Sequence, residues 1–246
     1  MSYISLSDND KKEMLAKIGI TSIEELFNSI PKDIKLNRAL DIPGPFSEAE
    51  VMDYFGKLAS KNSSPDILSF LGAGAYSHMI PSVVDYLSQR GEFVSPYTPY
   101  QPEVSQGTLQ TIFEFQTLIC QLTGLDIANA SLYDGASGAA EAVLMAFRLR
   151  NKPKVLVARS LHPQYKETIR TYVNNLHLDI REIGYDESGC MNLADLRESV
   201  DEETSVVIYQ SPNYFGAIEN IRKISETAHQ YNALSAAVIA EPVSLG

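Results

Sequence analysis

Apolar positions in the first part of the chain recur at the spacing of an α-helix and are separated by turn-forming residues. The pattern predicts a helix over residues 6–18, with Ser7 and Asp8 as candidate caps and Gly19 at its end. A capping box formed by Thr21 and Glu24 predicts the start of a second helix. Such short segments cannot bury all of their apolar faces by themselves, so we expect them to pack against another part of the protein.

A second capping box, Ser47 with Glu50, predicts a further helix over residues 51–60. The character of the sequence changes soon afterwards, from polar helices to apolar runs that end in glycine. We therefore predict an N-terminal helical arm, residues 1–65, and the first part of a large α/β domain, residues 66–246.

The beginning of the second part mixes helices with an irregular segment. A helix is predicted from Pro81 to Gly91, where the glycine ends it. Prolines make residues 97–107 an extended, irregular segment. The periodic apolar residues of 108–124 predict a long helix, with Cys120 in the core.

From residue 125 onward, apolar strands alternate with amphipathic helices. This alternation predicts an α/β fold in which helices flank a mostly parallel sheet. The chain ends on a strand and its turn, so we expect the sheet to be incomplete at the C-terminus or to be completed by another chain. Strands are predicted over residues 155–160, 178–186, 205–212 and 236–243, and helices over 136–150, 162–176, 193–200 and 221–233.

The charge of the chain excludes several classes of partner. Thirty-one acidic and twenty basic residues give a net charge of −11, which argues against nucleic-acid binding. The basic residues 148–154 are predicted to be the exposed end of a helix. No apolar run is long enough to span a membrane, and no secretory signal is recognisable, so we expect a soluble, cytoplasmic protein. The cysteine spacing predicts no metal site.

The glycine-rich turn of residues 133–141 opens a helix after a short predicted strand. Backbone N–H groups at such a helix start, with the Ser137 hydroxyl and the turn at Gly138, favour an anion such as phosphate. Alternatively, Gly135 and Gly138 allow the helix to pack tightly against the sheet. Both interpretations remain open.

Two tyrosines lie on the proline-rich segment. A tyrosine on a stiff, extended segment presents a flat apolar face and a polar tip, which suits the wall of a pocket or a subunit interface. Tyr97 and Tyr100 are therefore candidate functional residues. The alternative is that both rings brace the segment against the core.

Three further polar residues adjoin predicted strands or helices. Glu241 follows a strand at its carboxyl end, where α/β proteins place ligand contacts, although an ordinary solvated strand end is the alternative. His162 is predicted to be the residue at which a helix begins, and Asn213 to be a turn residue. His78 precedes a helix as well, and its role stays open.

Several long stretches resemble one known family, the P-protein of the glycine cleavage system, and within it the N-terminal subunit of glycine decarboxylase (glycine dehydrogenase decarboxylating subunit 1). The resemblance extends over essentially all 246 residues. The stretches that carry it are MLAKIGITSIEELFNSIP, LGAGAYSHMIPSVV, YTPYQPEVSQGTLQTIFEFQT, NASLYDGASGAAEA, HPQYKETIRTY, SPNYFGAIENI and EPVSLG.

The resemblance implies a type I pyridoxal-phosphate fold, shortened here at its C-terminal end. In the split form of the family two homologous subunits associate into a heterotetramer, and the lysine that forms the aldimine with pyridoxal phosphate belongs to the second subunit. The pair decarboxylates glycine and transfers the aminomethyl group to the lipoyl group of H-protein. All eleven lysines of this chain are expected in the arm, in surface loops or on polar helix faces, where none serves as that lysine.

The resemblance also assigns roles to the candidate residues. It implies that Tyr97 and Tyr100 reach the substrate end of the partner's cofactor, as catalytic residues of a shared site. It implies that Ser137, Gly138 and Glu241 are vestigial cofactor-binding positions. A structural subunit that only stabilises its catalytic partner, and a self-sufficient enzyme cut off before its lysine, are the alternatives.

Overall fold

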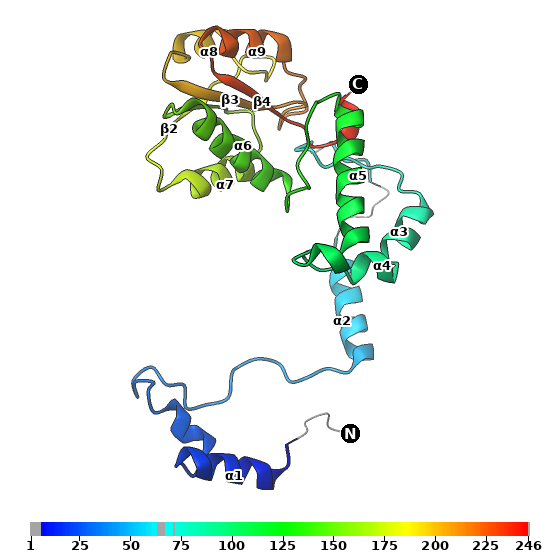
Figure 1. Cartoon of the computed structure of the whole chain (residues 1–246), viewed down its shortest axis with the longest axis vertical. Helices are drawn as coiled ribbons and strands as arrows, with labels where there is room; N and C mark the ends of the chain where they lie inside the picture. Colours follow the sequence, from blue (N-terminus) through cyan, green and yellow to red (C-terminus); the bar gives the residue numbers. More distant parts are fainter. Residues whose placement is uncertain (1–5, 63–66, 71, 246) are drawn as a thin grey trace. The chain divides into compact units, whose positions relative to one another are not determined.

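The computed structural model describes residues 6–62, 67–70 and 72–245 (Figure 1). The chain divides into two compact units, Met1–Ile67 and Leu68–Gly246. The assignment of these units as an arm and as part of a larger domain stays a prediction. Within the described ranges, no helix combines the length and the hydropathy that crossing a membrane requires.

The helix starts of the first unit are set by side-chain caps. Helix α1 (Asp8–Ile18) begins after Ser7, whose side chain accepts a hydrogen bond from the Asp10 N–H, and ends at Gly19 in the left-handed conformation. Helix α2 (Glu48–Ala59) begins at the predicted capping box, in which Glu50 accepts from the Ser47 N–H at 2.8 Å. Both caps are at predicted residues, although α1 starts two residues later and α2 three residues earlier than the predicted ranges 6–18 and 51–60.

The predicted capping box of Thr21 and Glu24 is wrong by one residue. The carboxylate of Glu25 accepts hydrogen bonds from the N–H groups of Thr21 at 2.9 Å and Ser22 at 3.1 Å. The element that follows is a 3₁₀-helix, η1 (Ile23–Phe27). Because the carboxylate of Glu25 accepts from the N–H groups of both Thr21 and Ser22, Glu24 takes no part in the cap.

The second unit begins with short helices and one long helix. These are α3 (Ser82–Ser88), α4 (Gly91–Val94), η2 (Pro102–Val104) and α5 (Gln106–Thr123). The prediction that Gly91 ends the first of these helices is wrong, because α3 ends at Ser88 with Gln89 as its C-cap and Gly91 starts α4. Gly124 ends α5 with a φ of 70°. The prediction of Cys120 in the core is wrong, because the side chain is half-buried and α5 contains no buried residue.

A four-stranded parallel sheet forms the centre of the second unit and confirms the α/β prediction. Its strands are ordered β2-β1-β3-β4, and each neighbouring pair is parallel. The strands are β1 (Lys154–Ala158), β2 (Asp179–Ile183), β3 (Thr204–Gln210) and β4 (Leu234–Val238). The helices between and before them are α6 (Gly135–Arg150), α7 (Pro163–Val173), α8 (Leu193–Ser199) and α9 (Ile221–Gln230), and η3 (Pro242–Leu245) follows.

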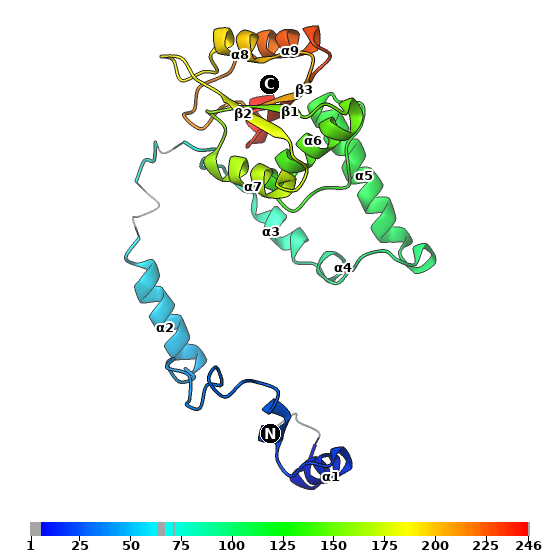
Figure 2. The same cartoon turned by 90° about the vertical axis from the view of Figure 1, so that its left-hand side faces the viewer.

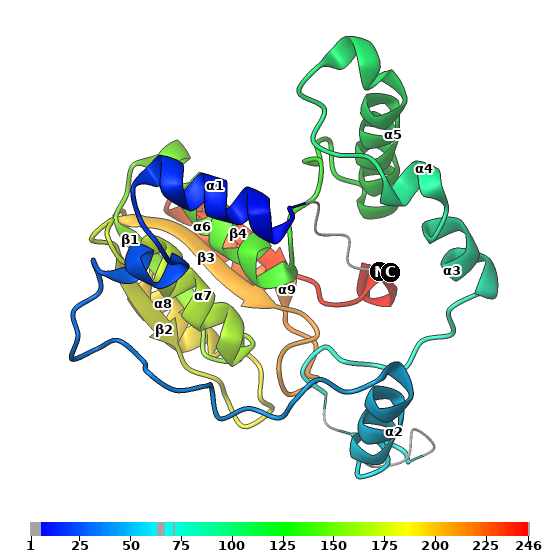
Figure 3. The same ribbon diagram turned by 90° about the horizontal axis from the view of Figure 1, so that it is seen from below.

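Helices cover both faces of this sheet. Figures 1 and 2 show α6 and α7 on one face and α8 and α9 on the other, and in Figure 3 α6 and α7 lie in front of the strands. Every residue of the two central strands, β1 and β3, is consequently buried. The largest fully buried apolar side chains of the strands are Tyr209, Leu156, Ile208, Ile183, Val155 and Val157.

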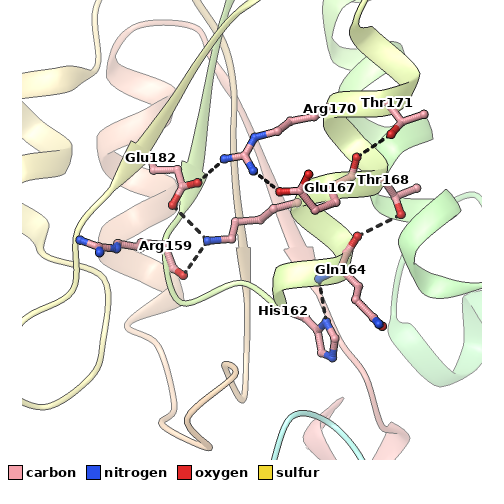
Figure 4. A network of polar contacts seen from close by, with 9 residues as sticks. Arg159, His162, Gln164, Glu167, Thr168, Arg170, Thr171 and Glu182 are labelled. Carbon is pink, nitrogen blue, oxygen red and sulfur yellow. Dashed lines mark hydrogen bonds and ion pairs between the residues drawn. The ribbon is translucent and has the colours of Figure 1, made fainter.

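The outer strand β2 is held to α7 by a network of charges (Figure 4). Lys166 donates to Glu182 at 3.0 Å and to the carbonyl oxygen of Arg159 at 3.2 Å, and Arg170 donates to both Glu182 and Glu167. Burial raises the pKa of Glu182, but the hydrogen bond and charge of Lys166 and the charge of Arg170 hold it below its usual value. Charged side chains on an outer strand also discourage pairing with other chains.

Candidate functional site

The turns that follow β1, β3 and β4 lie at one edge of the sheet, because the strands are parallel. We call this the carboxyl edge; it is where open α/β folds bind their ligands. The turn after β1 carries His162, the turn after β3 carries Tyr214, and Glu241 lies three residues beyond the end of β4 at Val238. The predicted place of Glu241, next to a strand end, is thus approximately right.

His162 is the N-cap residue of α7, as predicted. Its Nδ1 atom accepts a hydrogen bond from the Gln164 N–H at 3.2 Å, a contact visible in Figure 4. Its own N–H donates to the side-chain oxygen of Gln210 at 3.0 Å, which ties the start of α7 to the end of β3. The imidazole ring packs against Tyr165 and, edge to face, against Tyr214, with ring centroids 5.3 Å apart in both cases.

A segment far away in the sequence passes over the same edge. The N–H of Ala73 donates to the carbonyl oxygen of Tyr214 at 3.3 Å. Gly74 has a φ of 82°, and a β-carbon on it would lie 2.7 Å from the β-carbon of Ala240. Only glycine combines this backbone conformation with so close an approach.

His78 and Glu241 are brought together at the edge. The Nε2 atom of His78 lies 3.6 Å from a carboxylate oxygen of Glu241, whose side chain is 14% exposed and also accepts from the hydroxyl of Ser244. Glu241 is therefore a partner of this chain's own side chains and not a freely solvated strand end. The sequence singled out both residues but did not predict that they meet.

The glycine-rich turn binds a carboxylate of its own chain. Asp134 is the N-cap of α6 and accepts from the Ser137 N–H at 2.7 Å, and its carbonyl oxygen accepts from the Gly138 N–H at 3.0 Å. The backbone and side-chain hydrogen bonds of Ser137 hold the pKa of Asp134 below its usual value. Residues 125–134 contain no strand, so the predicted strand before this turn is wrong.

Pyridoxal phosphate does not fit the start of α6. Its phosphate would need the N–H group of Ser137, which Asp134 already uses, and it would face the charge of that carboxylate. A β-carbon on Gly135 would overlap the hydroxyl of Tyr165, so this glycine permits close packing against α7, whereas the packing interpretation placed that contact at the sheet. At Gly138 the nearest side-chain atom would be 3.8 Å from a β-carbon, and packing does not require a glycine there. Among the described residues no cluster of three His, Cys, Asp or Glu side chains is arranged to hold a metal ion.

The lysines of the second unit correct one prediction. Lys154 is neither in a loop nor on a helix but is the first residue of β1; it is 7% exposed and paired with Asp201. The basic run 148–154 is therefore only partly an exposed helix end. Lys152 donates to the carbonyl oxygen of Tyr231 at 2.9 Å. Lys166 is paired with Glu182 of β2, so the amino groups of Lys152, Lys154 and Lys166 are all hydrogen-bonded. Lys223 lies exposed in the first turn of α9.

The two candidate tyrosines are among the most exposed aromatic residues. Tyr97 is 82% and Tyr100 79% exposed, and their ring centroids are 6.5 Å apart. Neither hydroxyl has a hydrogen-bond partner among the described residues, and neither ring contacts Ser137 or Glu241 there. Neither ring is buried among the described residues, and the role of the pair stays a prediction.

Sequence reasoning missed four residues of the carboxyl edge: Tyr165, Gln210, Tyr214 and the buried Glu219. Asn213 is a turn residue, as predicted, but it is fully buried and hydrogen-bonded to Glu219. Polar residues directly follow only β1 and β3, as Arg159 and Ser211, and this sequence signal does not show which side chains of the edge meet.

Comparison with known proteins identifies the family. The family model described as glycine cleavage system P-protein matches residues 1–246. A protein of Koribacter versatilis named probable glycine dehydrogenase (decarboxylating) subunit 1 is 45% identical over 247 positions, which are 100% of this chain and 56% of that protein. One of the same name from Desulforamulus reducens is 47% identical over 100% of this chain and 55% of its own length. The chain thus spans about half the length of these curated relatives.

Solved structures agree with this result. A crystal structure of glycine decarboxylase (P-protein) of the glycine cleavage system, in inhibitor-bound form, superposes with a TM-score of 0.77 and 42% identity over 100% of this chain and 54% of that one. The sphingosine-1-phosphate lyase of Burkholderia pseudomallei, at 15% identity and a TM-score of 0.59 over 85% of this chain and 50% of its own, shares the fold alone. The predicted type I pyridoxal-phosphate fold is confirmed, and the chain belongs to the glycine cleavage system P-protein family.

Proposed function

We propose that this chain belongs to one subunit of a glycine dehydrogenase (decarboxylating). Together with a second, homologous subunit it decarboxylates glycine and transfers the aminomethyl group to the lipoyl group of H-protein. The observation that supports this most strongly is the similarity to proteins named subunit 1 of that enzyme, which extends over the whole chain at 45–47% identity. Assembly as a heterotetramer in the cytoplasm is part of the same proposal.

The cofactor of the proposed enzyme is pyridoxal phosphate, bound covalently by the second subunit. When bound, it provides the electron sink that decarboxylation of an amino acid requires. Two features of this chain support a site in the partner: Asp134 neutralises the helix start that would otherwise attract a phosphate, and the amino groups of Lys152, Lys154 and Lys166 are hydrogen-bonded. On this proposal Ser137, Gly138 and Glu241 are the remains of a second site.

Tyr97 and Tyr100 are the residues that this chain contributes to the partner's site. Their exposure leaves both hydroxyls available to a ligand or to another subunit. A phenolic hydroxyl donates and accepts hydrogen bonds, so the pair is suited to orient the carboxylate of glycine and to exclude water from the breaking bond. Catalysis at a shared interface gives this subunit a role without a cofactor of its own.

The second candidate function is a structural subunit that only stabilises its partner. The start of α6 favours it, since the carboxylate of Asp134 already accepts from the Ser137 N–H group that an anionic ligand would use. The two functions differ in one measurable respect: a structural subunit tolerates loss of the Tyr97 and Tyr100 hydroxyls as long as the complex assembles.

The proposal is tested by expressing the full chain with its candidate second subunit and with lipoylated H-protein. The assay is the exchange of carbon between bicarbonate and the carboxyl group of glycine, and borohydride reduction followed by peptide mapping locates the cofactor. We expect exchange only when both subunits are present, and a labelled peptide only in the partner. An assembled but inactive complex, or a label on this chain, would contradict the proposal.

A further inference from the structure

Glu219 is a buried carboxylate at the carboxyl edge that no part of the proposed function uses. It lies between β3 and α9, is 4% exposed and forms no ion pair with a described lysine, arginine or histidine. One carboxylate oxygen accepts from the Ser160 hydroxyl at 3.0 Å and from the Asn213 side-chain nitrogen at 2.8 Å. The other accepts from the N–H of Met191 at 2.8 Å. Since burying a carboxylate is costly, three convergent donors indicate a defined task.

The three partners of Glu219 come from three different turns. Ser160 follows β1, Asn213 follows β3, and Met191 belongs to the turn that follows β2, where it pairs with Tyr185. A single side chain therefore joins the segments behind three adjacent strands. These segments are otherwise separated by whole helices in the sequence, so their mutual position depends on contacts of this kind.

The joined turns carry the aromatic residues of the edge. The carbonyl oxygen of Ser160 accepts from the N–H of Tyr214 at 2.9 Å, and the side-chain oxygen of Asn213 accepts from the N–H of Phe215 at 3.0 Å. Tyr214 then packs edge to face on the ring of His162. A path of direct contacts thus leads from the Glu219 carboxylate to that ring.

We propose that Glu219 is the positioning residue of the carboxyl edge: it holds the turns behind β1, β2 and β3 together and thereby fixes the rings of Tyr214 and His162. An ionised carboxylate is an acceptor at both oxygens, which matches the three donors around it. This role does not depend on the reaction that the complex catalyses. It is a property of this chain and can be measured without turnover.

The variant Glu219→Gln tests this role with almost no change of shape. The Asn213 amide cannot turn round, because its oxygen already accepts from the N–H groups of Phe215 and Ala217. The new NH₂ group must therefore face either the N–H of Met191 or the NH₂ of Asn213, which are both donors. The matched control is Glu226→Gln, which removes the same charge from an exposed position on α9 that forms no ion pair or side-chain hydrogen bond with a described residue.

Hydrogen exchange followed by mass spectrometry, on the full chain in complex with its partner, is the measurement. We expect Glu219→Gln to speed exchange about ten- to one-hundred-fold in residues 159–162, 189–192 and 213–217 together. Exchange in β1 and β3, and everywhere in Glu226→Gln, should stay as in the wild type. Faster exchange in only one turn, in the sheet as much as in the turns, or nowhere, would overturn the proposal.

A second measurement connects this role to catalysis and rests on the proposed function. With the complex intact, we expect glycine–bicarbonate exchange to fall at least about ten-fold in kcat for Glu219→Gln and to remain unchanged for Glu226→Gln. If the wild-type complex is inactive, the proposed function fails and the hydrogen-exchange result still stands. If the wild type is active and both variants equal it, Glu219 does not position the reacting groups and the link to catalysis is wrong.

Discussion

The hydroxyl group of Tyr165, on α7, occupies the space that a β-carbon on Gly135 would need at the start of α6. Helices α6 and α7 lie on the same face of the sheet (Figure 1), and this is a point of very close approach between them. Protein interiors are packed densely enough that an added methyl group displaces its neighbours. Gly135 therefore determines how closely the two helices approach each other.

Replacement of Gly135 by alanine is expected to destabilise the protein. The new methyl group overlaps the Tyr165 ring, and overpacking of this kind costs about 1–3 kcal/mol. Thermal unfolding should show a lower midpoint, by about 2–4 °C for each kcal/mol in a chain of this size. The double variant Gly135→Ala, Tyr165→Phe should regain part of the loss, because it removes the nearest atom.

Gly107→Ala is the control for that experiment. Gly107 lies in the first turn of α5, and a β-carbon there would have no neighbour within 4 Å. Because alanine has the higher helix propensity, we expect no loss and a gain of at most about 1 kcal/mol. Equal destabilisation by both substitutions would contradict the close approach of α6 and α7.

Stability should depend on pH through Asp134. Hydrogen bonds from Ser137 lower the pKa of Asp134 in the folded state, so its contribution is present above the ordinary pKa of about 4 and is lost as the pH falls below it. Asp134→Ala should therefore be less stable than the wild type at pH 7, and the difference should shrink on acidification. Asp134→Ser keeps an N-cap acceptor without a charge, and its difference from Asp134→Ala should not vary between pH 7 and pH 3.

The ion pair of Lys154 and Asp201 should respond asymmetrically to substitution. The side chain of Lys154 is 8% exposed and that of Asp201 is 50% exposed, so only the lysine depends on its partner for compensation. Asp201→Asn leaves a buried ammonium group and should cost about 1–2 kcal/mol. Lys154→Met leaves a carboxylate that water reaches and should cost less than about 1 kcal/mol. Urea unfolding of both variants measures this, and the opposite order would contradict the burial of Lys154.

Tyr97→Phe and Tyr100→Phe should reduce glycine–bicarbonate exchange in the assembled complex. If each hydroxyl orients the substrate, its loss lowers kcat about ten- to one-hundred-fold without changing the stability of the subunit. Tyr86→Phe, at an exposed position on α3, is the control and should be fully active. Wild-type rates for both loop variants, with assembly verified by gel filtration, would favour the structural subunit instead.

The sequence predicted the helices and the two central strands of the α/β region because their signals are local. The apolar runs of β1 and β3 are short, rich in β-branched residues and bounded by turns, which is typical of buried parallel strands. The strand predicted over 236–243 lies instead at Leu234–Val238, and residues 125–134 contain no strand.

Helix starts at Ser7, Ser47 and His162 depend on residues within three positions of the cap. Where two adjacent residues offered a cap, as at Thr21 and Ser22, the spacing alone did not decide the exact box.

The candidate site was less predictable, because its contacts join distant residues. Glu219 meets Ser160 across 59 positions and Met191 across 28, and no periodic pattern indicates such pairs. Lys154 looks like a surface residue in the sequence, because a charged residue before an apolar run normally remains in water. Its partner Asp201, 47 positions away, compensates the charge of the buried ammonium group, which also donates to the carbonyl oxygen of Ser199 at 3.4 Å.

The order of the strands has a consequence for synthesis on the ribosome. Lys154 of β1 lies beside Asp179 of β2 and Thr204 of β3, so the central strand finds its neighbours only after about 25 and 50 further residues have been made. At translation rates of about 5–20 residues per second, β1 remains without its inner neighbour for about 3–10 seconds. During that interval the apolar residues 155–158 are available to chaperones or to other nascent chains, and yield in the cell will depend on how well they are shielded.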